Sequence, residues 1–293
     1  MIILDGNTLS SKIKEELKIR VVKLRAERHR APHLAALLVG DNPAGQSYVG
    51  NKIKFCEEVG YRSTLIRKPA NFSEEELIET IQALNHDSEI DGYIVQLPLP
   101  GHINDEKINL AIDYEKDVDG FHPMNFGRMA QGMPSYLPAT PYGILEMLSR
   151  YDINTDGKHC VVVGRSNIVG TPMSILLSRK GIPGNCTVTL THSRTRDIKE
   201  ELLRADIIIA AIGIPNFVKG DMVKEGAVVI DVGINRVADN SRKSGFRLVG
   251  DVDFDGIKDK VAAITPVPGG VGPMTVTALM LNTYKAATKE IYR

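Results

Sequence analysis

Apolar residues in the first hundred positions follow two alternating spacings. Residues 9–26 place Ile13, Leu17, Val21 and Leu24 at the three- to four-residue spacing of an amphipathic helix. Short, strand-like apolar runs then alternate with further helical patterns. The predicted strands are residues 33–39, 62–66 and 91–97, and the helices between them are residues 47–59 and 73–84, the latter opening on a Ser-Glu-Glu-Glu capping box. This alternation predicts βαβ units around a parallel sheet.

The same alternation returns in the second half of the chain. A helix is predicted at residues 141–151, strands at 160–163, 187–191, 207–210, 227–231 and 262–264, and a last helix at 274–291. Residues 116–138 are expected to be loop-rich. The fold class is therefore α/β with two domains. Residues 1–140 with the C-terminal helix 274–293 form an N-terminal βαβ parallel-sheet domain, and residues 141–273 form a Rossmann-type domain.

The composition excludes several classes of protein. The 293 residues include 36 basic and 36 acidic side chains, which gives no reason to expect nucleic acid or an anionic membrane as a partner. The apolar runs are too short to span a bilayer, and the first residues lack the basic region of a secretory signal. Three widely separated cysteines are typical of a reducing compartment, so we expect a cytoplasmic protein. No metal site is expected, because the histidines show no ligand spacing.

A glycine turn in the second half is the first candidate for chemistry. The predicted strand 160–163 is followed by Gly164, Ser166, Gly170 and Pro172, the last opening an apolar helical pattern. A strand, a glycine turn and a helix start aim free backbone N–H groups and the helix dipole at an anion such as a pyrophosphate. Ser166 replaces the second glycine of the usual dinucleotide motif. The alternative interpretation is an ordinary strand–helix junction.

The end of the next strand bears on which nucleotide would bind. An NAD site commonly has Asp or Glu there, whereas this chain has Ser193, Arg194 and Arg196, with Arg165 in the glycine turn. Hydroxyl and guanidinium groups suit a 2′-phosphate, so NADP is favoured over NAD. The alternative is that these arginines are solvated loop charges.

Tyr48 and Lys52 lie four residues apart on the predicted helix 47–59, and Phe55 and Val59 continue that face. An ammonium group on an apolar face is poorly solvated, so the pKa of Lys52 should fall toward values useful for proton transfer. The alternative is a lysine that extends to solvent.

Two further polar groups follow predicted strands or turns. Gln96 lies at the carboxyl end of the strand 91–97, where ligands bind in open α/β sheets, although a turn-stabilising glutamine is an equal alternative. Asp119 follows Asp117 and precedes Gly120. Its carboxylate could accept paired N–H donors from a guanidine-like ring edge, or it could belong to a solvated acidic turn.

Residues 266–275 are unusually rich in proline and glycine. Such a segment lets the backbone approach a flat ligand closely. We predict that at least one X-Pro peptide bond in this segment or in residues 97–100 is cis.

Together these motifs resemble one family over essentially the whole chain. The stretches are Tyr-Val-Gly-Asn-Lys (48–52), Val-Gln-Leu-Pro-Leu-Pro (95–100), Asp-Val-Asp-Gly-Phe (117–121), Gly-Arg-Ser-Asn-Ile-Val-Gly (164–170) and the Pro/Gly segment 266–275. In this order they resemble the bifunctional methylenetetrahydrofolate dehydrogenase/methenyltetrahydrofolate cyclohydrolase family. The resemblance implies a folate-binding catalytic domain, an NADP-binding domain, a cleft between them that holds folate, and a homodimer. It also implies a place in one-carbon metabolism and purine biosynthesis.

The resemblance also implies roles for individual residues. Lys52 would move protons in the cyclohydrolase step, beside the catalytic residues Tyr48, Gln96 and Asp119. The residues implied for the folate site are Tyr48, Gln96, Leu97, Asp119, Pro268, Gly269 and Gly270. Those implied for NADP are Gly164, Arg165, Ser166, Ile168, Ser193, Arg194 and Ile234.

The activity implied is oxidation of 5,10-methylenetetrahydrofolate with NADP⁺ and hydrolysis of the product to 10-formyltetrahydrofolate. Alternatives are a dehydrogenase of another small substrate, a monofunctional dehydrogenase, and a non-catalytic module that binds folate or nucleotide.

Overall fold

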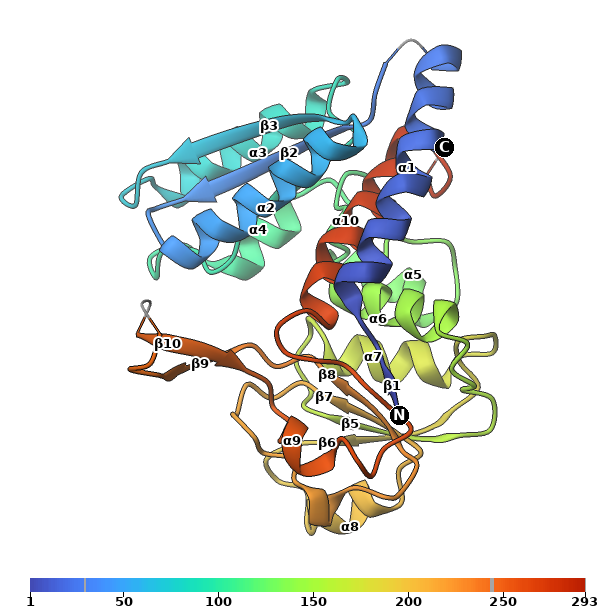
Figure 1. Ribbon diagram of the computed structural model, residues 1–293. Coiled ribbons are helices and arrows are strands. Elements are labelled where there is room, and N and C mark those ends of the chain that lie inside the picture. The colour runs from blue at the N-terminus through green and yellow to red at the C-terminus, as the bar shows by residue number, and fades with distance from the viewer. Residues whose placement is uncertain (29, 243–244, 293) are drawn as a thin grey trace. The chain divides into compact units, whose positions relative to one another are not determined.

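The structure is a computed structural model that describes residues 1–28, 30–242 and 245–292 (Figure 1). The chain divides into two compact units, each named here by its larger sheet. The six-stranded unit comprises Met1–Ser10 and Thr140–Thr275, and the three-stranded unit comprises Ser11–Ala139 and Val276–Arg293. The helices α1 (Gly6–Arg28), α6 (Ala139–Arg150) and α10 (Val271–Thr288) contain the points where the chain passes from one unit to the other.

The first ten residues differ from the expected domain boundaries. We expected residues 1–140 in one domain, but the strand β1 (Ile2–Ile3) pairs in parallel with β11 (Ala263–Ile264) of the six-stranded unit. The amide of Leu4 extends this pairing by donating to the carbonyl oxygen of Ile264. A two-residue strand leaves no periodic pattern in the sequence, which is why the pairing of β1 with the six-stranded unit was not predicted.

The three-stranded unit contains the predicted parallel sheet. Its strands are β2 (His33–Val39), β3 (Arg62–Lys68) and β4 (Gly92–Val95), in the order β3-β2-β4. The helices α3 (Glu74–His86) and α4 (Asp105–Ala111) cover one face, where Leu37 packs with Leu77 and Ile108. The helix α2 (Pro43–Val59) lies against the other face, as Figure 1 shows, with Gly45 next to Leu38.

Two local predictions in this unit can be compared directly with the structure. The capping box is confirmed, since the side chains of Ser73 and Glu76 each accept a hydrogen bond from the other residue's backbone amide. Residues 116–138, expected to be loop-rich, also contain the helix α5 (Pro123–Ala130), which was not predicted and whose N-cap His122 side chain accepts from the amide of Met124. Proline at the first helical position was an available signal.

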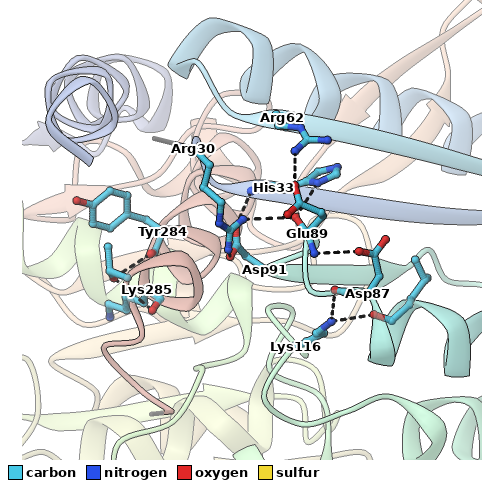
Figure 2. A network of polar contacts seen from close by, with 11 residues as sticks. Arg30, His33, Arg62, Asp87, Glu89, Asp91, Lys116, Tyr284 and Lys285 are labelled. Atoms are coloured by element: carbon cyan, nitrogen blue, oxygen red, sulfur yellow. Dashed lines mark hydrogen bonds and ion pairs between the residues drawn. The ribbon is translucent and has the colours of Figure 1, made fainter. Parts of the chain in front are cut away.

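A polar network fixes the amino-terminal end of this sheet (Figure 2). The buried carboxylate of Asp91 accepts hydrogen bonds from the backbone amide of His33, at 2.8 Å, and from the guanidinium of Arg30. The His33 ring bonds to the Glu89 carbonyl oxygen and to Thr64 Oγ1. The starts of β2 and β4 are therefore joined through side chains, away from the carboxyl ends where Gln96 follows β4.

The six-stranded sheet is entirely parallel, with the order β1-β11-β8-β7-β5-β6. Its other strands are β5 (His159–Val163), β6 (Thr187–Thr191), β7 (Ile207–Ala210) and β8 (Val228–Asp231). The helices α6 and α7 (Gly170–Ser178) lie on one side of the sheet, and α8 (Ile198–Leu203) and α9 (Phe254–Ile257) on the other (Figure 1). The order of connection reverses between β5 and β7, which marks the topological switch point where such sheets bind ligands.

The sequence did not predict a hairpin that leaves this sheet. Its strands β9 (Asn235–Ala238) and β10 (Phe246–Val249) pair antiparallel and project from the six-stranded sheet (Figure 1). A short 3₁₀ turn at Gly220–Met222 precedes β8. None of the described helices combines the length and hydropathy needed to cross a membrane.

Candidate functional site

Lys52 lies on the buried side of α2. Its side chain is 9 % exposed and shares its face with the buried Phe55 and Val59, as the apolar spacing predicted. Burial disfavours the ammonium form and lowers the pKa of Lys52, while the negative charge of Asp119 acts in the opposite direction. Tyr48, one turn earlier, is 44 % exposed. The helix therefore presents a desolvated amine next to a partly solvated phenol.

Gln96 is the hydrogen-bond partner of Lys52. The lysine Nζ donates to Gln96 Oε1 at 3.1 Å, and Gln96 Nε2 donates to the Leu97 carbonyl oxygen at 2.8 Å. Because the Nε2 group is occupied by a carbonyl, the amide oxygen must face the lysine. An amide oxygen accepts a hydrogen bond from either the amine or the ammonium, so Gln96 orients Lys52 without fixing its charge.

The peptide bonds before Pro98 and Pro268 are cis. This confirms the prediction made for the two proline-rich segments.

Asp119 completes the polar group around Lys52 in the three-stranded unit. Burial raises the pKa of its carboxyl group, and the nearby positive charge of Lys52 opposes that rise. The pKa shifts of Lys52 and Asp119 therefore have the same main cause, since removal from water disfavours the charged form of each side chain. Burial therefore favours the uncharged form of both the acid and the amine, which suits them to exchange protons with a substrate.

Hydrogen bonds and a close backbone contact hold the turn that contains Asp119. Asn282 donates both of its Nδ2 hydrogens, one to the Val118 carbonyl oxygen at 2.8 Å and one to the Leu137 carbonyl oxygen at 2.9 Å. The Ala139 amide donates to the Asp119 carbonyl oxygen. Gly120 has a φ of +74°, and an added Cβ would lie 2.5 Å from the Leu137 carbonyl carbon. Only glycine fits this position without strain, and the hydrogen bonds to Val118, Leu137 and Asp119 hold the turn in place.

Asp117 has a different role from Asp119. Its buried carboxylate accepts hydrogen bonds from the amides of Gly120 and His122 and from Asn125 Nδ2. Burial is the main influence and raises the pKa of Asp117 to about 7, although these bonds act against the rise. We did not identify Asp117, Asn125 or Asn282 from the sequence. The Asp-x-Asp-Gly pattern marks both acids equally and does not say which one supports the turn.

The Pro/Gly segment packs against the start of α1 within the six-stranded unit. The Gly269 carbonyl oxygen accepts hydrogen bonds from the amides of Gly6 and Asn7 at 2.8 and 3.2 Å. A Cβ on Gly6 would lie 1.8 Å from the carbonyl oxygen of Gly270. Gly6 is thus required by contact between two backbones, whereas Pro268 is exposed at the surface of the unit.

The glycine turn after β5 is tightly closed. A Cβ on Gly164 would lie 2.2 Å from the Ala211 carbonyl oxygen, and one on Gly170 would lie 1.9 Å from the carbonyl oxygen of Gly164. These close approaches join the loops after β5 and β7 at the topological switch point. Glycine is therefore necessary here for packing as well as for access by a ligand.

The start of α7 differs from the prediction of free amides. Ser166 Oγ accepts from the amides of Val169 at 3.1 Å and Gly170 at 3.4 Å, and the Ser166 carbonyl oxygen accepts from Thr171 at 3.0 Å. The hydroxyl therefore occupies the amides of Val169, the N-cap residue, and Gly170, the first residue of α7, although Val169 itself makes no side-chain capping bond. An anion bound at this helix start would have to displace the Ser166 hydroxyl or use other groups.

The candidate cationic groups lie beside this turn. The Gly164 amide donates to the Thr191 carbonyl oxygen, so the residues after β6 emerge next to the glycine turn. Arg165, Ser193, Arg194 and Arg196 are all exposed, and none of the three arginines forms an ion pair with the residues that the structure describes. These guanidinium groups are available to an anionic ligand.

Exposed isoleucines follow three neighbouring strands of the same sheet. Ile168 comes after β5, Ile214 after β7 and Ile234 after β8, and they are 43 %, 50 % and 46 % exposed. The family resemblance had implied Ile168 and Ile234 for NADP, but not Ile214. Large apolar side chains exposed at the carboxyl ends of parallel strands are suited to contact with a flat ring system.

The family models and the curated relatives identify the same family. Residues 4–119 match the catalytic domain, and residues 138–291 the NAD(P)-binding domain, of tetrahydrofolate dehydrogenase/cyclohydrolase. The bifunctional protein FolD of Cytophaga hutchinsonii is 57 % identical over 98 % of this chain and 99 % of its own. The crystal structure of the bifunctional FolD methylenetetrahydrofolate dehydrogenase/cyclohydrolase from Campylobacter jejuni is 46 % identical, with a TM-score of 0.93 and 99 % of each chain covered.

A third relative was solved with ligands. The methylenetetrahydrofolate dehydrogenase-cyclohydrolase of Trypanosoma brucei, complexed with NADP and an inhibitor, is 36 % identical with a TM-score of 0.93 and covers 100 % of this chain and 99 % of its own. These relatives share both domains with this chain over nearly their full lengths. The chain belongs to the tetrahydrofolate dehydrogenase/cyclohydrolase family.

Proposed function

We propose that the protein oxidises 5,10-methylenetetrahydrofolate with NADP⁺ and hydrolyses the resulting 5,10-methenyltetrahydrofolate to 10-formyltetrahydrofolate. Membership of the family supports both activities. The observation that supports them best within this chain is the buried Lys52, hydrogen-bonded to Gln96 and influenced by Asp119. A binding module would have no need for an amine whose pKa is lowered by burial.

In the hydrolytic step Lys52 is proposed to move the protons. A water oxygen bonds to the methenyl carbon while the neutral amine accepts one of the water's protons. The bond between that carbon and N5 then breaks, N5 receives a proton from the ammonium, and the other water proton is released. Gln96 would hold Nζ in place through both halves, since its amide oxygen accepts from the amine and the ammonium alike.

We propose that Asp119 binds the pterin ring edge, with Tyr48 and Leu97 beside the folate. Its carboxylate can accept two parallel N–H donors, a geometry that also fixes the plane of the ring. The rigid turn around Gly120 supports this role because a carboxylate on a mobile loop would orient the ring poorly. The family resemblance also assigns Pro268, Gly269 and Gly270 to folate binding.

For NADP⁺ we propose the loops at the carboxyl ends of β5, β6 and β8. NADP⁺, when bound, accepts the hydride that leaves the methylene carbon. Gly164, Arg165 and Ser166 would hold the phosphates, Ser193 and Arg194 the 2′-phosphate, and Ile168 and Ile234 the rings. The close contact of Gly164 with Ala211 and the arginines without ion pairs among the described residues support this assignment.

The test follows two reactions with the purified protein. Reduction of NADP⁺ or NAD⁺ is measured with methylenetetrahydrofolate, and decay of methenyltetrahydrofolate is measured without nucleotide. We expect NADP⁺ reduction together with protein-dependent decay. Reduction without decay would indicate a monofunctional dehydrogenase and refute the role of Lys52. If the protein binds folate but shows neither reaction, it is a binding module.

We further propose that the protein is a homodimer in the cytoplasm. The family resemblance supports pairing through the six-stranded unit, and light scattering of the intact protein would test it. All three cysteines are buried and unpaired, which suits a reducing compartment.

A further inference from the structure

Two buried carboxylates of the six-stranded unit have no part in the site described above. Asp231 ends β8, and Asp251 lies between β10 and α9. They are 3 % and 0 % exposed. Neither forms an ion pair with the described residues, and each is held by N–H donors alone. A buried carboxylate is costly unless such donors solvate it, so their arrangement has structural consequences.

Asp251 binds two loops at once. Its Oδ2 accepts from the amides of Ile212 at 2.7 Å and Gly213 at 2.9 Å, in the loop after β7. Its Oδ1 accepts from Asn235 Nδ2 at 2.9 Å, at the end of the loop after β8. One side chain therefore connects the loop that contains Ile214 to the loop that contains Ile234.

Asp231 holds Asp251 and the second loop from the other side. Its Oδ1 accepts from the amides of Gly233 and Asp251, both at 2.9 Å, and its Oδ2 accepts from Val252 at 3.0 Å. Burial raises the pKa of Asp231 to about 6, with the three amides opposing the rise. Six N–H groups thus surround the two carboxylates.

Two neighbouring glycines allow the backbone to come close to these carboxylates. A Cβ on Gly233 would lie 2.2 Å from Asp251 Oδ1, and one on Gly250 would lie 1.7 Å from Asp231 Oδ2. The backbone therefore approaches each carboxylate as closely as glycine permits. The loop after β7 is in turn fixed to the glycine turn after β5, through the contact of Gly164 with Ala211.

We propose that Asp251, supported by Asp231, is a positioning residue for the nucleotide. It holds the loops after β7 and β8 so that Ile214 and Ile234 stay exposed at the carboxyl ends of these strands. The inference rests on the proposed NADP-dependent activity, and it adds Ile214 to the surface that contacts the nucleotide. Asp251 itself is buried and touches no ligand.

The decisive variant is Asp251→Asn, which keeps the shape but replaces one acceptor oxygen by an N–H₂ group. That group meets either the amides of Ile212 and Gly213 or the Asn235 amide, so at least one contact is lost unless Asn235 turns over. Asn235→Leu removes only the contact between the loop after β8 and Oδ1. Asp255→Asn is the matched control, because Asp255 is exposed and, within the described part of the chain, forms an ion pair only with Lys258.

For each variant, KM and kcat are measured with NADP⁺ and methylenetetrahydrofolate, the dissociation constant of NADP⁺ is measured by calorimetry, and nucleotide-free cyclohydrolase activity is measured in parallel. We expect Asp251→Asn to raise the KM and the dissociation constant for NADP⁺ between about fivefold and a hundredfold. Cyclohydrolase activity should stay within about twofold of wild type. Asn235→Leu should also raise the KM and the dissociation constant for NADP⁺, but by a smaller factor.

Other results would overturn the proposal. An unchanged affinity for NADP⁺ in both folded Asp251→Asn and folded Asn235→Leu protein would show that the loops do not depend on the contacts of Asp251, because Asn235→Leu removes the side chain that could turn over. An equal fall in both activities would indicate general destabilisation. If Asp251→Asn does not fold, an unchanged NADP⁺ affinity in Asn235→Leu refutes the proposal. Absence of NADP⁺ reduction by wild-type protein would instead refute the proposed function.

Discussion

Replacing Lys52 by methionine should separate the two proposed activities. Methionine keeps the unbranched, buried shape of the side chain among Phe55 and Val59 but has no group that moves a proton. General acid–base catalysis contributes about 10²- to 10⁴-fold to a rate, so the cyclohydrolase kcat should fall by that factor, or about 3–5 kcal/mol of barrier. Hydride transfer requires no base, and dehydrogenase activity should remain within about tenfold.

The structural cost of this substitution should be small. Gln96 Oε1 loses its partner, but Gln96 is half-buried and water can replace the amine, so we expect at most about 1–2 kcal/mol of destabilisation. Lys54→Met is the matched control, because Lys54 lies on the exposed side of the same helix. Thermal unfolding of both variants checks that the fold is intact.

The assay compares methenyltetrahydrofolate decay with NADP⁺ reduction over a range of pH. The lowered pKa of Lys52 means that its neutral form increases at lower pH than for an ordinary lysine. Wild-type hydrolysis should therefore rise with pH through an ionisation below 10.5, and Lys52→Met should lack that ionisation. Loss of both activities to the same degree in folded protein would refute the role given to Lys52.

Three further substitutions test other parts of the site. The pKa of Asp117 is raised to about 7 in the folded protein, so its contribution to stability is lost as pH rises from about 4 to 7. In urea titrations, the unfolding free energy of wild type relative to Asp117→Asn should therefore fall by about 2–3 kcal/mol between about pH 5 and 8. A constant difference would contradict the burial argument. Gly120→Ala places a methyl group against Leu137 at a positive φ, so it should lower the urea midpoint and raise the KM for folate, and unchanged values would show that the turn is less rigid than described. Arg194→Ala should raise the KM for NADP⁺ about tenfold or more with little effect on NAD⁺, and equal effects on the two nucleotides would exclude contact with a 2′-phosphate.

Local patterns predicted most of the elements and the face of α2 that contains Lys52. The spacing of apolar residues along a helix repeats within a few turns, so the buried face of a helix can be predicted from a short stretch of sequence. The partnership of Lys52 with Gln96 joins residues 44 positions apart, and depends on how β4 and α2 pack on the same sheet. The sequence identified both residues, and only the fold shows that they are bonded.

Asn282, Asp251 and the capping role of Ser166 could not be predicted, because each depends on contacts that the fold brings together. Asn282 reaches Val118 across 164 positions, and nothing in its surroundings on α10 distinguishes it from a polar residue at the surface. Asp251 lies in a segment without helical or strand periodicity, and its role depends on amides of two other loops. Ser166 was recognised as unusual, but its capping bonds to Val169 and Gly170 required the actual path of the loop.

The division of the chain between the two units affects how the protein can be made. Residues 11–139 leave the ribosome early, yet the three-stranded unit also requires the last part of the chain, from Val276 onward. The carbonyl oxygens of Val118 and Leu137 have no Asn282 to bind until residue 282 has been synthesised, 164 positions after Val118. The turn that presents Asp119 therefore forms its full set of contacts only after residue 282 has left the ribosome, and a fragment that stops at residue 139 would lack these two hydrogen bonds.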